Sequence, residues 1–132
     1  MALDHETFTL LKDTVRRFVD ERLIPAEPAV AESDVIDPAI LSQMRELGLF
    51  GLSIPQEWGG LGLGMAEEVE IVMELCRAAP AFRSAVGTNI GIGSQAIVLA
   101  GTEAQRERYL PRLASGELVS SFALTEPDAG SD

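Results

Sequence analysis

The sequence contains very few of the residues from which disulfides and metal centres are built. Among 132 residues there is one cysteine, Cys76, and one histidine, His5. A single cysteine excludes an internal disulfide and fits a reducing compartment, so we expect a cytoplasmic protein. The thiol lies on the apolar face of a predicted helix, which favours a buried structural role over a nucleophilic one. The isolated His5 has no partner ligands, and no metal site is predicted.

Basic residues are also scarce. Ten lysines and arginines stand against 21 aspartates and glutamates, which gives a net charge of −11. This balance argues against a nucleic-acid partner, because phosphate backbones are bound by basic surfaces. Residues 1–24 carry several acids and do not read as a targeting peptide. The uncharged run 84–102 contains polar residues and glycines, so we expect a helix buried on all sides within a helical domain and no membrane partner.

Hydrophobic residues recur at helical spacing near the N-terminus and predict an amphipathic helix over about residues 4–23. Its inward stripe consists of Phe8, Leu11, Val15, Phe18 and Val19. Pro25 and Pro28 are expected to end this helix, because proline lacks the N–H that an interior position needs. Residues 26–36 have little periodicity and predict a loop.

Asp37 as N-cap and Pro38 at the first helical position predict the start of a second helix. Gly48 is expected to end this helix. Residues 49–64 hold five glycines together with apolar side chains, so we expect a loop that packs against the core and includes one helical turn. Its run Gly59–Gly64 is not a dinucleotide-binding fingerprint, because no strand precedes it and no βαβ unit surrounds it.

Three more helices complete the pattern, over about residues 65–79, over about 83–100, and from the T-x-x-Q capping box of Thr102 and Gln105 onward. The first of these has an apolar stripe made of Met65, Val69, Val72, Met73 and Cys76. Such methionines either line a ligand pocket or pack in the core, and core packing is the commoner outcome. A β-like run begins near Val119.

The predicted fold class is therefore all-α, a five-helix bundle-like domain over residues 1–117 that ends in the first strand of a β-domain. That β-domain begins in residues 118–132, and a lone strand cannot satisfy its own N–H and C=O groups. We therefore expect the sequence to be the N-terminal part of a longer protein or a truncated gene product.

The last residues carry the most specific signal. After the β-like run the chain turns at Pro127, and Gly130 allows a ligand to approach the main chain. N–H groups in such a turn suit an anion, and the Ser131 hydroxyl adds a donor. The Thr125 hydroxyl is placed to meet a flat heteroaromatic ring.

Three segments resemble the acyl-CoA dehydrogenases. Leu124–Asp132 is similar to the flavin-contacting signature of that family, Gly48–Leu63 to the loop after its second helix, and Gly101–Glu117 to the segment before its middle domain. The segments occur in the expected order and spacing, and the resemblance covers essentially the whole chain.

The resemblance implies FAD as cofactor, bound in part by the end of the chain. Phe122, Leu124 and Thr125 would lie along the flavin ring system, while Gly130 and Ser131 would meet the pyrophosphate. Ser131 would also touch the CoA arm of the substrate. Glu126 is structural in this family, which carries its catalytic glutamate in a C-terminal domain, so we nominate no catalytic residue here.

In the same family the fourth helix borders the acyl-chain pocket, which makes Thr88, Asn89 and Ile92 candidate substrate-binding residues. Gly87 and Gly91 either leave room for the acyl chain or permit close helix packing.

The implied reaction is α,β-dehydrogenation of an acyl-CoA thioester to a trans-2-enoyl-CoA, with electrons passed to electron-transfer flavoprotein or a similar acceptor. The resemblance also implies a homo-oligomer, a tetramer or a dimer. Two alternatives remain: an acyl-CoA oxidase or flavin monooxygenase of the same superfamily, and a helical binding module without catalysis. Oxygen reactivity and residues downstream of this sequence distinguish them.

Overall fold

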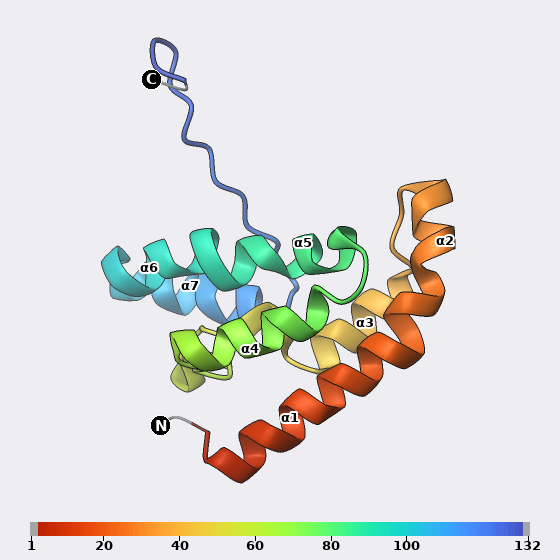
Figure 1. Cartoon of the computed structure of the whole chain (residues 1–132). Coiled ribbons are helices and arrows are strands. Elements are labelled where there is room, and N and C mark those ends of the chain that lie inside the picture. Colours follow the sequence, from red (N-terminus) through yellow and green to blue (C-terminus); the bar gives the residue numbers. More distant parts are fainter. Residues whose placement is uncertain (1–2, 131–132) are drawn as a thin grey trace.

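The computed structural model describes residues 3–130 and consists of helices from which a C-terminal segment projects (Figure 1). In chain order the elements are α1 (His5–Phe18), η1 (Val19–Leu23), α2 (Ile24–Ser33), α3 (Pro38–Glu46), η2 (Leu49–Gly51), η3 (Gln56–Trp58), α4 (Met65–Leu75), α5 (Pro80–Thr88), η4 (Asn89–Gly93), α6 (Ser94–Ala100) and α7 (Glu103–Ala114). Because α1, η1 and α2 run on without a break, as do α5, η4 and α6, the described residues form five helical bodies. The prediction of an all-α, five-helix domain is confirmed.

The first helical body is longer than predicted. It continues through Pro25 and Pro28 to Ser33, so the expected end of the helix and the loop over 26–36 were both wrong. The turn before Pro25 is a wide π turn in which the Ile24 N–H bonds to the Val19 carbonyl, five residues back. A proline ring normally clashes with the carbonyl four residues before it, and widening the helix at that point relieves the clash.

The second helix and the following loop agree with the sequence prediction. Asp37 accepts a hydrogen bond from the Ala39 N–H at 2.7 Å, and α3 ends before Gly48. The loop packs against the core as expected, with its apolar residues Leu49, Phe50, Leu52 and Ile54 fully buried or nearly so. Gly60 has a steric role there, since a Cβ at this position would lie 2.0 Å from the Ile54 carbonyl oxygen.

The buried face of α4 is not the one predicted. Met65 and Met73 are 79% and 65% exposed, and the Cys76 thiol, expected to be buried, is also exposed. The helix instead buries Ile71, Leu75 and Glu74, because it carries apolar residues on two sides and its acid Glu74 pairs with Arg16 on α1.

Ion pairs that link the first helical body to α4 and to Arg77 just after it accompany this packing. The Arg16 guanidinium lies 2.6 Å from Glu74, Arg77 bonds to Asp20 at 2.6 Å and to Glu74 at 3.3 Å, and Lys12 lies 2.7 Å from Glu70. Hydrogen bonds from Arg16 hold the pKa of the Glu74 carboxyl below its ordinary value, against the opposing effect of burial.

The fourth helical body is only half covered. Its inner side buries Phe82, Val86 and Ile90, whereas Ile92 and Leu99 are 55% and 78% exposed. The prediction that this helix is buried on all sides was therefore wrong. None of the helices in residues 3–130 combines the length and the apolar character that crossing a membrane requires.

Replacing Glu74 by Gln tests the buried ion pair. Because the folded pKa is lowered, the carboxylate stabilises the fold above the unfolded pKa, and this stabilisation disappears as pH falls through the folded pKa. We expect E74Q to lower the free energy of unfolding by about 1–2 kcal/mol at pH 7, since its arginine partners are half exposed and screened by water. Urea denaturation at pH 7 and pH 3 should show the difference shrinking in acid.

The half-exposed Glu70 provides the matched control, and E70Q should lower the stability less than E74Q at pH 7. An E74Q loss of the same size at both pH values would instead assign the effect to packing.

Candidate functional site

The C-terminal tail, residues 118–130, leaves the helical domain after α7 and passes the fourth helical body before extending away from it (Figure 1). The strand expected from Val119 has no pairing partner, and within residues 3–130 the only β-type pairing is the bridge between Glu126 and Ala129. The tail is therefore extended but not part of a sheet, as follows for a single strand without a neighbour.

The start of the tail is held by the side chain of Asn89, which lies in η4. The Asn89 amide donates to the main-chain carbonyls of Leu113 at 3.0 Å and Leu118 at 2.8 Å. Its oxygen accepts from the Ser120 N–H at 2.8 Å and from the Ser120 hydroxyl at 3.1 Å. Asn89 is completely buried, and these bonds use all four positions of its amide.

Gly93 allows this close passage of the tail over η4. A Cβ at Gly93 would lie 2.3 Å from the Ser120 Cβ and 2.9 Å from the Thr88 carbonyl oxygen. Sequence reasoning missed the roles of Gly93 and Ser120. The available signal was a small residue one helical turn after the only asparagine of the chain.

The far end of the tail forms a closed turn. The Glu126 N–H donates to the Ala129 carbonyl at 2.9 Å, and the Ala129 N–H donates back at 3.3 Å. Pro127 has no N–H, so the turn offers the N–H groups of Asp128 and Gly130, which make no main-chain hydrogen bond in the described part of the chain. A Cβ at Gly130 would meet nothing within 4 Å, so that side of the turn is open.

The flavin-site residues predicted from the sequence lie together on this tail. Phe122 and Leu124 are 56% and 72% exposed, and Thr125 is exposed beside them. Ser131 lies outside the described residues. Uncovered apolar side chains, a hydroxyl and the N–H groups of the turn are the kinds of group that contact a flat ring joined to a pyrophosphate.

The three predicted substrate residues separate into two groups. Thr88 is half-buried and Ile92 exposed, on the outer side of the fourth helical body, whereas Asn89 faces inward and has no free donor or acceptor for a ligand. Gly91 borders open space, and a Cβ at Gly87 would meet the Arg83 guanidinium of the same helix. These two glycines leave room at the surface and do not mediate close packing between helices.

Two charged groups, Glu68 of α4 and Arg83 of α5, lie near each other at the start of the fourth helical body. Burial raises the pKa of the Glu68 carboxyl, while a hydrogen bond with Ser53 and the nearby Arg83 act in the opposite direction. Beyond Arg83, the fourth helical body carries no charged residue up to its end at Ala100. This surface suits an aliphatic chain better than an ionic ligand.

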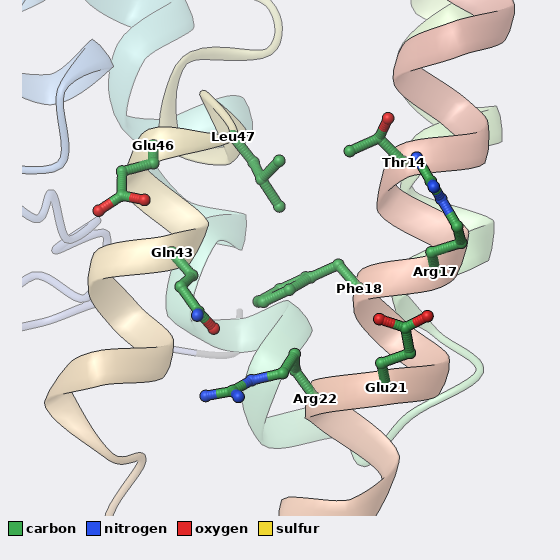
Figure 2. Close-up of a pocket in the computed structure, with 8 residues that line it drawn as sticks. All are labelled: Thr14, Arg17, Phe18, Glu21, Arg22, Gln43, Glu46 and Leu47. Atoms are coloured by element: carbon green, nitrogen blue, oxygen red, sulfur yellow. The ribbon is translucent and has the colours of Figure 1, made fainter.

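A separate cleft of about 400 Å³ lies between the first helical body and α3 (Figure 2). Phe18 points into it from the first helical body, toward Gln43 and Leu47 (Figure 2). None of the residues predicted to contact flavin or acyl-CoA lines this cleft. The candidate site is therefore the tail together with the outer side of the fourth helical body.

The family model for the acyl-CoA dehydrogenase N-terminal domain matches residues 5–117. The chain therefore belongs to the acyl-CoA dehydrogenase family and contains that N-terminal domain. It is 40% identical to the (2S)-methylsuccinyl-CoA dehydrogenase of Cereibacter sphaeroides, with 99% of this chain and 24% of that protein covered. It is also 40% identical to the acryloyl-CoA reductase (NADH) of Anaerotignum propionicum, over 93% of this chain and 31% of that protein.

Among solved structures, the acyl-CoA dehydrogenase of Bacillus anthracis complexed with FAD superposes with a TM-score of 0.83 and is 36% identical. The alignment covers 98% of this chain and 22% of that one. The chain thus spans about a quarter of the length of the relatives it matches, and the tail lies just beyond the residues of the family domain.

Substituting each of two neighbouring glycines by Ala tests the passage of the tail. Gly93→Ala should push Ser120 out of place and lower the stability, because the new Cβ would overlap the tail. Gly91→Ala has open space around it and should raise the stability by up to about 1 kcal/mol through helix propensity. Thermal unfolding, together with hydrogen exchange at the Ser120 amide, measures both. Equal behaviour of the two variants would contradict the packing described here.

Proposed function

We propose that this chain is the N-terminal part of an FAD-dependent acyl-CoA dehydrogenase that oxidises an acyl-CoA thioester to its trans-2-enoyl form. The observation that carries this proposal is the tail, where Phe122, Leu124 and Thr125 are uncovered beside a preformed turn that ends at Gly130. Membership of the family and the FAD held by the Bacillus anthracis relative support it.

Each part of the tail has a distinct task in this proposal. Phe122 and Leu124 bury their apolar surface against the flavin ring system, and the Thr125 hydroxyl donates a hydrogen bond to the ring. The N–H groups of Asp128 and Gly130, with Ser131, meet the pyrophosphate, because N–H groups in a turn form a concave anion site. When bound, FAD supplies the hydride acceptor that the protein itself lacks.

The outer side of the fourth helical body has the second task, which is to border the acyl chain. Thr88 and Ile92 face it, and Gly91 leaves space beside the helix. Excluding water from an aliphatic chain contributes binding energy of about 0.8 kcal/mol for each buried methylene. Asn89 takes no direct part in this contact.

The catalytic base is assigned to sequence beyond this chain. Glu126 is the acid nearest the proposed flavin site, and its side chain is exposed. Its main chain pairs with that of Ala129 and closes the turn, which matches a structural role. For the intact protein we propose an electron acceptor of the electron-transfer flavoprotein type and a homo-oligomeric state.

A second candidate is the reverse reaction, reduction of an enoyl-CoA. It is favoured by the 40% identity to acryloyl-CoA reductase (NADH). Both directions need the same flavin wall and acyl surface, so the redox partner distinguishes them.

Replacing Thr125 by Ala in the full-length protein tests the flavin contact. Loss of one hydrogen bond should weaken FAD retention or slow flavin reduction by acyl-CoA about tenfold, since such a bond contributes about 1–1.5 kcal/mol. Flavin absorbance after gel filtration and stopped-flow bleaching measure the two effects, and Ser131→Ala is expected to act in the same direction. Thr102→Ser is the matched control. It changes a threonine at the other end of α7 from the tail, and serine preserves the helix cap there. Unchanged flavin content and kinetics in T125A would remove this residue from the site.

The 132-residue chain alone is expected to show no dehydrogenation of butyryl- or palmitoyl-CoA with an artificial electron acceptor, because it supplies neither the base nor a complete flavin site. The full-length protein under the same conditions is the positive control. Measurable turnover by the short chain would place the base within residues 1–132.

A further inference from the structure

We propose that Asn89 is a positioning residue, which sets the register between the flavin-facing tail and the acyl-facing side of the fourth helical body. This inference rests on the proposed function for the roles of those two surfaces. The positions and bonds of Asn89 itself come from the structure alone.

The Asn89 amide joins three segments at one point. Its two donors reach the carbonyls of Leu113, in the last turn of α7, and of Leu118, at the start of the tail. Its oxygen receives both hydrogen bonds from Ser120. The turn at 115–116 lies between the two carbonyls, so the amide fixes the chain on both sides of this turn and with it the direction in which the tail leaves.

The same helical turn carries the proposed acyl contacts. Thr88 ends α5 directly before Asn89, and Ile92 follows Asn89 within η4. Asn89 faces inward, whereas Thr88 and Ile92 lie on the outer side of the helix. A displacement of the tail against this turn would therefore move flavin-facing groups relative to acyl-facing groups. Misplacement of reacting groups by about 1 Å can slow a reaction about a hundredfold, although no residue that touches the reactants has changed.

The tail is held at this point by specific hydrogen bonds to a helix side chain and not by nonspecific apolar contact. Asn89 is completely buried, and every hydrogen-bonding position of its amide is occupied. Gly93, one turn later, is the residue whose lack of a side chain admits Ser120. A buried polar side chain with all partners satisfied specifies one arrangement, because any other leaves unpaired groups.

Asn89→Asp separates the two halves of this interaction. The carboxylate keeps the acceptor for Ser120 but loses both donors and turns an oxygen toward the carbonyls of Leu113 and Leu118. Ser120→Ala removes only the bond from the hydroxyl. Ile71→Val trims the core under α4, away from the tail, and serves as a control for general loss of stability.

The test uses the full-length protein with bound FAD and follows flavin bleaching in stopped flow. The substrate is whichever of butyryl-, isovaleryl- and palmitoyl-CoA reduces the wild type fastest. We expect N89D to lower the reduction rate constant at saturating substrate by roughly ten- to a hundredfold, with S120A intermediate and I71V unchanged. Hydrogen exchange of the 118–121 amides should accelerate in N89D and stay unchanged in I71V.

Faster exchange in N89D with an unchanged rate constant would overturn the positioning role while leaving the proposed function in place. A wild-type protein that retains no FAD, or whose flavin none of the three thioesters bleaches, would overturn the proposed function instead. Should N89D fail to fold, Gly93→Ala displaces Ser120 without altering the amide and gives the same readout, and its unchanged rate constant would likewise overturn the proposal.

Discussion

A single side-chain amide in the middle of a helix ties the last helix of the domain to the tail that follows it. Burying an amide costs free energy unless each of its donors and acceptors finds a partner, and in Asn89 all of them do. Elsewhere the described chain is held mainly by apolar packing, together with the ion pairs of Glu74 and Asp20, and apolar contacts tolerate small shifts. The hydrogen bonds of the Asn89 amide do not tolerate such shifts. The direction in which the tail leaves the domain is therefore more sharply defined than apolar packing alone would make it.

Two long helices of the domain contain a π turn, and each turn accommodates something that a regular helix cannot. The turn at Val19–Leu23 makes room for the ring of Pro25. The turn at Asn89–Gly93 lies where the tail crosses the helix, with the amide at one end and a glycine at the other. In both cases the extra width lets the helix continue past an obstacle, which keeps its two ends in one rigid body.

Much of the fold could be predicted from the sequence because its signals are local. Asp37 with Pro38, and Thr102 with Gln105, mark helix starts through bonds that reach only two or three residues, and the structure contains these caps. The family membership was likewise readable, since the motif around Thr125 is contiguous.

The features that sequence reasoning missed depend on partners far along the chain. The buried side of α4 is decided by Arg16, 58 residues before Glu74, and the continuation past Pro25 is supported by the Glu27 carboxylate, which accepts the Ala79 N–H at 2.7 Å. Asn89 was placed in the correct helix but was expected to contact substrate, because the identity of a polar residue in an uncharged run does not indicate which way its side chain faces. Most of its hydrogen-bond partners are main-chain atoms, and every residue type carries these, so the sequence does not indicate them.

The outward side of α4 has a chemical consequence. Met65 and Met73 present their thioethers to solvent, whereas Met44 is fully buried in the core. Peroxide converts accessible methionines to sulfoxides, so the two outer sulfurs should be oxidised well before the inner one. Mass spectrometry of the oxidised intact protein would then reveal whether another part of the polypeptide, or a second copy, shields this helix.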